Sequence, residues 1–303
     1  MKIFLYGQFG RGNIGDDLMF LHYKSSSPKN VKFFKFFKLK YLKNFFPSNN
    51  YIKNFPMIFF ADKYVVTGGN QANFESIRSY LKISFQIVVL FIRKLFRKRN
   101  QIFSFGSEFQ YTSIQLFLVK HFLLQFDEIH VRDKKSYNYI QQNITKTNIF
   151  LSFDTGFIYL LDNYKKNIKK TFNSSSKIIN KPIFYFLSHH SGLSFNSRKE
   201  YLNQVAKENK NIIVFAQSKE DKKLASELSK KIKIKVVAYD FYSLDNFIKL
   251  LSDSSKIITE RFHGLIFAYA LNIRCEVRGN LPKLKNLWEL ERQRYSNEVK
   301  KFI

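Results

Sequence analysis

The sequence is poor in the residues that build disulfides and zinc sites. It has one cysteine, Cys275, and six histidines in 303 residues. A single cysteine excludes an intrachain disulfide and fits a reducing compartment. No set of Cys and His residues surrounds it with the spacing of metal ligands. We therefore expect neither a disulfide nor a bound metal.

Long apolar runs are also missing. The most apolar stretch, Ile83–Ile92, is interrupted by Ser84 and Gln86 and has about half of the roughly 20 residues that a spanning helix needs. The N-terminus reaches Gly7 after four apolar residues, which is too short for the core of a signal peptide. We expect a cytoplasmic protein that is not integral to a membrane.

Acidic residues are scarce, because 23 Asp and Glu stand against 51 Lys and Arg and the formal net charge is +28. None lies between Asp17 and Asp62, or between Glu75 and Glu108. Nucleic acid, an anionic membrane surface and anionic substrates are the partners that such a balance favours. A chain rich in Lys, Phe, Asn and Ile can equally reflect AT-rich codons, although this does not explain the clustering.

Two basic stretches interleave cations with aromatic residues, namely Lys32–Lys43 and Ile92–Arg99. As helices they would suit the headgroup region of an anionic bilayer. No RNA-binding motif or zinc-finger spacing is present, so we expect no nucleic-acid partner. We prefer peripheral attachment to the inner face of the plasma membrane, with a buried strand over Val31–Phe37 as the structural alternative.

The sequence does supply a core, with 45% hydrophobic and 24% charged residues. Short apolar runs that lead into helical sequence recur through both halves, which predicts α/β domains with parallel sheets. The expected strands are Lys2–Tyr6, Lys63–Thr67, Gln101–Phe105, Glu128–Val131, Ile183–Leu187, Asn211–Phe215, Ile234–Ala238, Lys256–Thr259 and Ile273–Val277. We expect Rossmann-like domains over 1–165 and 183–303, facing each other across a cleft and joined by a linker over 166–182.

A glycine-rich loop, Gly10–Asp17, follows the first strand and enters a helical pattern over Asp16–Tyr23. Glycines let the backbone approach a ligand, and a helix N-terminus favours anions. The loop is neither the dinucleotide fingerprint nor a P-loop, which would need Gly-Lys-Ser/Thr. A tight turn in which Asp16 caps the helix is the structural alternative.

Two further segments place cations at the carboxyl ends of expected strands. Thr259–Ala268 carries Arg261, which can grip phosphate or carboxylate, and His263, which a bound phosphate would keep protonated as a general acid. Val131–Ser136 supplies Arg132 as another anion ligand. A satisfied structural histidine and a solvated charge run are the respective alternatives.

In this order and spacing the segments resemble the polysaccharide pyruvyl transferase family over nearly the whole chain. The matching segments are Asn13–Asp17, Asp62–Gly69, Val131–Ser136, Asp154, Lys219–Asp221 and Arg261–Ala268. The resemblance implies two Rossmann-like halves arranged as in GT-B glycosyltransferases. It also implies transfer of the pyruvyl (enolpyruvyl) group from phosphoenolpyruvate, a co-substrate, to sugar hydroxyls as a ketal in cell-surface polysaccharide biosynthesis. We expect no other cofactor.

The resemblance and this chemistry assign roles to named residues. We expect His263 to donate a proton, and Asp16 or Asp17 to accept the hydroxyl proton or position the sugar. The expected substrate-binding residues are Arg261, Arg132, Phe262, Gly12, Asn13, Gly15, Gly68, Gly69, Asn70 and Lys283. The acceptor is expected to be a saccharide, and a lipid-linked precursor and a nucleotide sugar both stay open.

The chain departs from the family pattern at three places. Asn70 replaces the usual third glycine, Thr155 follows Asp154 in place of proline, and Arg278–Lys283 replaces a tyrosine-containing segment. These changes bear on the substrate more than on the fold. Two other interpretations stay open, namely a GT-B glycosyltransferase with a nucleotide-sugar donor and a basic adaptor without activity.

Overall fold

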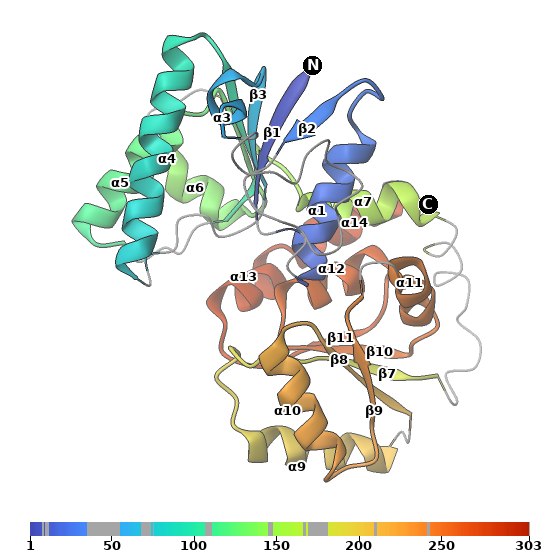
Figure 1. The fold of residues 1–303 in the computed structure, drawn as a ribbon. Coiled ribbons are helices and arrows are strands. Elements are labelled where there is room, and N and C mark those ends of the chain that lie inside the picture. The colour runs from blue at the N-terminus through green and yellow to red at the C-terminus, as the bar shows by residue number, and fades with distance from the viewer. Residues whose placement is uncertain are drawn as a thin grey trace. The chain divides into compact units, whose positions relative to one another are not determined.

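The structure is a computed structural model of the 303-residue chain. It describes residues 1–7, 9, 12–34, 55–67, 74, 76–106, 111–144, 148–165, 168, 181–208, 211–240 and 243–302. The chain forms two compact units, one of residues 1–11 with 15–156 and one of residues 12–14 with 157–303 (Figure 1). The division between the units falls within helix α7, Thr155–Asn163, and most of the expected linker over 166–182 lies outside the described residues.

In the described part of the first unit, six parallel strands are paired in the order β2-β1-β3-β4-β5-β6. The strands are β1 (Lys2–Tyr6), β2 (Lys32–Phe34), β3 (Lys63–Thr67), β4 (Arg99–Phe105), β5 (Glu128–Val131) and β6 (Ile149–Leu151). The helices are α1 (Ile14–Ser25), α3 (Met57–Phe60), α4 (Ile77–Leu95), α5 (Ser113–Leu124) and α6 (Lys134–Asn143). Helices connect consecutive strands, as parallel pairing requires.

The described part of the second unit has five parallel strands in the order β11-β10-β7-β8-β9. The strands are β7 (Ile183–Phe186), β8 (Ile212–Ala216), β9 (Lys235–Ala238), β10 (Lys256–Thr259) and β11 (Cys275–Val277). Besides most of α7, the helices are α9 (Phe195–Glu208), α10 (Lys219–Ser229), α11 (Leu244–Ser252), α12 (Phe262–Ala270), α13 (Pro282–Leu290) and α14 (Arg292–Phe302). Two parallel α/β domains are therefore confirmed.

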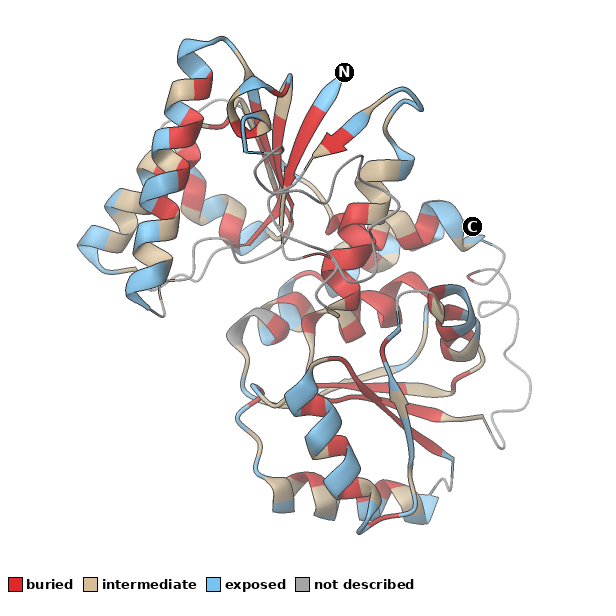
Figure 2. Cartoon of the chain, in the orientation of Figure 1, coloured by how far each residue is buried: buried red, intermediate tan, exposed pale blue. Residues whose placement is uncertain are grey.

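The strands carry the core of each unit, because helices cover both faces of a parallel sheet. Every residue of β7 and of β8 is buried. Figure 2 shows the strands largely buried and the outer sides of the helices exposed. Burial on both faces explains why these strands appear in the sequence as continuous apolar runs.

A buried charge anchors α4 to the first sheet. Arg93, near the end of α4, is 0% exposed and donates to the Ile58 carbonyl and to the Asn100 side chain, both at 2.8 Å. Burial lowers the pKa of Arg93 to about 10. The stretch Ile92–Arg99 is therefore not one continuous helix, since α4 ends at Leu95, and Arg93 points inward. Its attachment to a membrane surface stays a prediction.

The other basic aromatic stretch begins as a strand. Lys32–Phe34 pair in parallel with β1, and Phe33 is buried. Lys32–Phe34 therefore form a strand, as the structural alternative predicted, and not part of a helix. The rest of Lys32–Lys43 lies outside the described residues.

In each sheet, the strand that comes first along the chain is paired on both sides. β1 lies between β2 and β3, and β7 lies between β8 and β10. The loops that follow β1 and β3, or β7 and β10, therefore diverge at the carboxyl edge. Open α/β sheets bind ligands at such topological switch points. The sequence motifs after β1 and β10 lie at these two points.

Candidate active site

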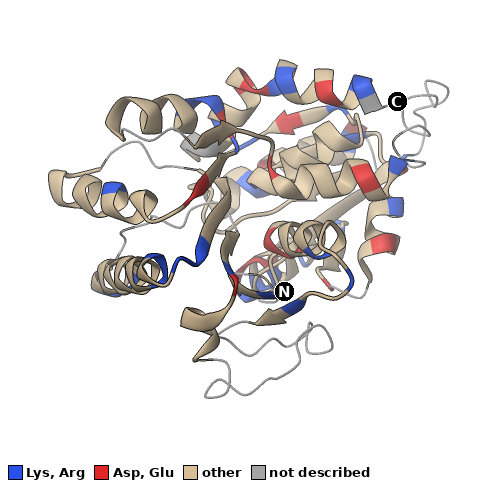
Figure 3. Ribbon diagram, turned by 90° about the horizontal axis from the view of Figure 1, so that it is seen from above, with Lys and Arg blue, Asp and Glu red and all other residues tan. Residues whose placement is uncertain are grey.

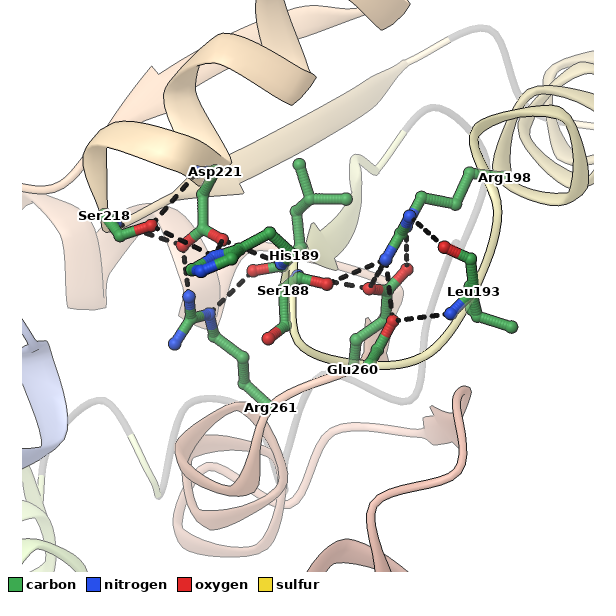
Figure 4. A network of polar contacts seen from close by, with 10 residues as sticks. Ser188, His189, Leu193, Arg198, Ser218, Asp221, Glu260 and Arg261 are labelled. Carbon is green, nitrogen blue, oxygen red and sulfur yellow. Dashed lines mark hydrogen bonds and ion pairs between the residues drawn. The ribbon is translucent and has the colours of Figure 1, made fainter. Parts of the chain in front are cut away.

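The second unit gathers polar side chains at its switch point (Figure 4). Ser188 and His189 follow β7, and Glu260 and Arg261 follow β10. Asp221 lies in the first turn of α10, which follows the neighbouring strand β8. These segments are distant in the sequence, but parallel strands bring their carboxyl ends to the same edge of the sheet.

Asp221 connects three of these segments. Its carboxylate accepts the backbone N–H of His189 at 2.9 Å, lies 2.8 Å from His189 Nδ1, and pairs with the guanidinium of Arg261. The side chain is 0% exposed. Burial by itself would raise the pKa of Asp221, but the charge of Arg261 and the hydrogen bonds of His189 and Ser218 outweigh it and hold the pKa at about 2. The carboxylate is therefore ionised at neutral pH.

Arg261 is held by several contacts. Its Nε donates to the Leu187 carbonyl at 2.7 Å, its Nη2 reaches Asp221, and its backbone N–H donates to Thr259 Oγ1 at 2.9 Å. A guanidinium has five N–H donors, and these side-chain contacts use two of them. Since 18% of the side chain is exposed, the other donors suit an anion that approaches from the open side.

A buried ion pair fixes the loop that carries His189. Arg198 of α9 and Glu260 are 3% and 0% exposed, with Nε 2.9 Å from Oε1 and Nη2 2.9 Å from Oε2. Glu260 accepts the backbone N–H of Ser188 at 3.1 Å and the hydroxyl of Tyr185. Arg198 donates to the Ser188 carbonyl at 2.7 Å. This pair therefore positions the loop, and it has little contact with solvent.

Gly264 lets α12 begin close to the strands. A Cβ at this position would lie 2.2 Å from Thr259 Oγ1 and 2.8 Å from the Phe186 ring. The first turn of α12 carries Phe262, which is 7% exposed, and the half-buried His263. Their ring centroids are 5.3 Å apart. Arg261 and His263 thus share one turn at the switch point.

The glycine loop follows β1, at the switch point of the first sheet. A Cβ on Gly7 would come within 2.7 Å of the Thr67 carbonyl at the end of β3. Gly12 has a φ of +87°, a conformation that glycine adopts without strain. Asn13 precedes α1 and Gly15 lies in its first turn. Gly7, at the end of β1, thus lies close to the carboxyl end of β3.

The two candidate acids lie in the first turn of α1. Asp16 is 9% exposed and Asp17 is 0% exposed, and a negative charge there is favoured by the helix dipole. The helix begins at Ile14, so the alternative in which Asp16 is the N-terminal cap is wrong.

Four expected binding residues cannot be placed in full. Gly68, Gly69 and Asn70 lie outside the described residues. Lys283 belongs to α13, and its side chain lies outside the described residues as well.

Arg132 lies in a buried ion pair. It is 4% exposed, and its Nη1 lies 3.3 Å from the fully buried Asp154 carboxylate. A Cβ at Gly106 would come within 2.8 Å of its Nε, so glycine makes room for the guanidinium. The next residue, Asp133, caps α6 by accepting the backbone N–H and the hydroxyl of Ser136, both at 2.8 Å. The alternative of a solvated charge run is therefore wrong for this part of the segment.

Part of this site was predicted from the sequence, namely Arg261, Phe262 and His263, which lie at the junction of β10 and α12. His189 was not predicted, although a histidine after an expected strand was a usable signal. Glu260 pairs with Arg198, which is 62 positions away, and nothing in the sequence connects them. The pattern Ser218-x-x-Asp221 was visible, and the structure shows it as a capping box at the start of α10.

A pocket of about 190 Å³ lies in the second unit, at the carboxyl ends of β8 and β9 and along α11. It is lined by Phe215, Val237, Ala238, Tyr239, Asp240, Ser243, Asn246, Phe247 and Leu250. Apolar walls with a few polar groups are typical of small-molecule sites.

Two parallel α/β units with polar loops at their switch points define a GT-B-like enzyme scaffold. The family model for polysaccharide pyruvyl transferase matches residues 13–276. The chain belongs to this family. It is therefore a transferase, and membership implies a saccharide acceptor.

Solved structures share the fold at low sequence identity. The UDP-GlcNAc 2-epimerase of Methanocaldococcus jannaschii, in complex with UDP-GlcNAc and UDP, gives a TM-score of 0.62 at 13% identity, covering 100% of this chain and 92% of that one. The UDP-GlcNAc 2-epimerase of Neisseria meningitidis, bound to UDP-GlcNAc, gives 0.60 at 12% identity, covering 99% and 91%. Such likeness shows the fold alone. No curated protein matches the chain in sequence.

Proposed function

We propose that this protein transfers the pyruvyl group of phosphoenolpyruvate to two hydroxyls of a sugar, as a cyclic ketal, in the synthesis of a cell-surface polysaccharide. One observation carries the proposal. Arg261 and His263, which belong to the motif most specific to the family, share one turn at the switch point, and Asp221 and Leu187 hold the guanidinium.

The donor carries several negative charges, so its site must supply cations and hydrogen-bond donors. Arg261 offers its remaining N–H groups on the exposed side, at the N-terminus of α12, where the helix dipole also favours an anion. His189, which Asp221 orients, is a further donor for the phosphate.

The reaction needs an acid and a base. His263 donates a proton to the methylene carbon of phosphoenolpyruvate, which makes the neighbouring carbon electrophilic. A sugar hydroxyl attacks that carbon and gives up its proton to a base. The second hydroxyl then attacks the same carbon and closes the ring as the bond from this carbon to the phosphate oxygen breaks, and its proton leaves with the phosphate as hydrogen phosphate. The products are the ketal, with its methyl and carboxylate groups, and inorganic phosphate.

Two variants separate binding from chemistry. Phosphoenolpyruvate should raise the melting temperature of the wild-type protein by mass action, and Arg261→Ala should lose this shift because its anion donors are gone. His263→Ala should keep the shift and lose about a hundredfold or more in turnover, because it lacks the proton donor. Turnover is measured as phosphate released in the presence of saccharide acceptors.

Arg294→Ala is the matched control for these variants. Arg294 lies in α14 of the same unit and pairs with Glu291, so its loss should leave the shift and the turnover unchanged. The proposed donor would be contradicted if phosphoenolpyruvate did not raise the melting temperature of the wild-type protein. Near-normal turnover of His263→Ala would contradict the proposed acid.

A glycosyltransferase with a nucleotide-sugar donor is the second candidate. The pocket at β8 and β9 favours it, because Phe215, Tyr239 and Phe247 offer aromatic walls to a flat base. Both epimerases above were solved with a nucleotide sugar. A melting-temperature shift with UDP- or CMP-sugars and none with phosphoenolpyruvate would favour this reaction.

We propose that the reaction takes place in the cytoplasm. The acceptor is then a lipid-linked saccharide at the inner face of the membrane or a water-soluble nucleotide sugar. Supplying each class of acceptor separately to the active protein distinguishes the two.

A further inference from the structure

The helix α4 has an apolar side that faces away from the sheet. Its inner side includes Ile83, Val89 and Leu90, which are at most 2% exposed. Its outer side carries large apolar residues three or four positions apart, which places them on one helix face. They are Ile77, Leu81, Phe85, Val88, Phe91 and Leu95, each 52% to 80% exposed. Figure 2 shows this outer side of α4 exposed.

The neighbouring helix α5 also carries exposed apolar residues. Lys94 Nζ donates to the Leu124 carbonyl at 2.7 Å, which joins the two helices near their ends, and Figure 1 shows them side by side. Ile114 and Phe117 of α5 are 68% and 59% exposed. The six residues of α4 and these two are called the α4 face below. With 19 residues, α4 is about 28 Å long, and the row covers nearly all of it.

Basic residues outnumber acidic ones around the α4 face, although Asp62 lies 3.6 Å from Lys98 Nζ just beyond the end of α4. No acidic residue lies between Glu75 and Glu108, or between Glu108 and Asp127. The exposed cations of this region are Arg78, Lys94, Arg97, Arg99 and Lys120. Figure 3 shows basic residues continuing from α4 into β4. The surface thus combines a wide apolar row with positive charge at its borders.

We propose that the α4 face docks the protein on an anionic membrane surface, with α4 lying in the plane of the headgroups. The apolar row can enter the boundary of the acyl chains while the bordering cations meet lipid phosphates. Monomeric proteins rarely expose an apolar patch of this extent without a partner. The attachment is peripheral, since no helix in the described part of the chain has the length and apolar character to cross a membrane.

Charge favours a membrane over a second copy of this chain. Two copies that met through the α4 face would bring their bordering cations together, in a protein whose net charge is already +28. An anionic bilayer would neutralise the same cations. The proposal does not depend on the reaction, because none of its residues belongs to the candidate active site.

Vesicle flotation tests the proposal. The full-length protein should float with vesicles of phosphatidylcholine and phosphatidylglycerol, and much less with phosphatidylcholine alone. The triple variant Leu81→Gln, Phe85→Gln and Phe91→Gln should bind the anionic vesicles about tenfold or more weakly, because three apolar side chains no longer enter the lipid. These side chains are exposed, so the melting temperature should not fall.

The matched control is Leu290→Gln, which removes an apolar side chain that is 59% exposed in the second unit. Its binding to vesicles should equal that of the wild type. The proposal is overturned if the wild type does not float, or if the triple variant floats as well as the control. It is also overturned if light scattering finds a wild-type dimer that the triple variant converts to a monomer, since a second copy then covers the face.

Discussion

At the scale of single residues, Asp221 organises the candidate site. One buried carboxylate holds the guanidinium of Arg261 and the imidazole of His189 at once. It can do so because the backbone N–H groups of His189 and Ser218 also donate to it, which offsets the cost of burying its charge. Removing the charge therefore affects both stability and the geometry of the cationic groups.

We expect Asp221→Asn to lower the free energy of unfolding by about 2 kcal/mol at neutral pH, since the pKa falls from its ordinary 3.8 to about 2 in the folded protein. A carboxyl whose folded pKa is depressed stabilises the protein above its unfolded pKa and loses this effect as the pH falls through the folded value. The difference between wild type and variant should thus shrink from about pH 4 toward pH 2.

Denaturant titrations over a pH series measure this difference. Asp162→Asn, at an exposed position of α7, should leave the free energy of unfolding nearly unchanged at every pH. The difference in free energy of unfolding between the wild type and Asp221→Asn could instead stay constant as the pH falls. That result would show that the lost stability comes from packing and not from the charge.

At the scale of elements, the junction between β10 and α12 determines where the anion-binding groups lie. Thr259 Oγ1 accepts the backbone N–H of Arg261 at 2.9 Å and donates to its carbonyl at 2.7 Å. These bonds fix the turn from strand to helix. Gly264 then allows the helix to start against Phe186 and Thr259.

We expect Gly264→Ala to lower the free energy of unfolding by about 2–3 kcal/mol, because its Cβ would overlap Thr259 and Phe186. The comparison is Gly192→Ala, where a Cβ meets nothing within 4 Å but φ is +77°. At Gly192, backbone strain alone should lower the free energy of unfolding of the alanine variant by about 1–2 kcal/mol. Chemical denaturation of both variants checks the order, and equal losses would contradict a packing role for Gly264.

The elements also differ in how well their sequence predicts them. β1, β3, β5 and β10 begin and end where the sequence placed them, because their apolar runs stop at small or polar residues. The short strand β6 was not predicted. It lies at the sheet edge, and its residues Phe150 and Leu151 are 47% and 37% exposed. An edge strand of three residues leaves no clear pattern.

At the scale of the whole molecule, the chain has two compact units, each with its own parallel sheet and buried strands. The ion pair of Arg198 with Glu260 belongs to the second unit alone. Removing one partner of such a buried pair lowers the free energy of unfolding by about 3–5 kcal/mol, because the other charge stays buried without its partner.

We therefore expect Arg198→Ala to destabilise the second unit selectively. Amide hydrogen exchange should become faster in β7, β8 and β10, while β1, β3 and β4 keep their protection. Glu200→Ala, at an exposed position of the same helix, is the control and should change neither unit. An equal loss of protection in both sheets would show instead that the two units unfold together.

The sequence by itself determined the fold class and the family of this protein. Parallel strands buried on both faces leave continuous apolar runs, and the Arg261–Ala268 motif is one uninterrupted segment, so both are visible without a structure. Only the tertiary structure decided what each charged group does. Arg93, Arg132 and Arg198 look alike in the sequence, but their buried partners lie on other elements, and strand order brings those partners to them.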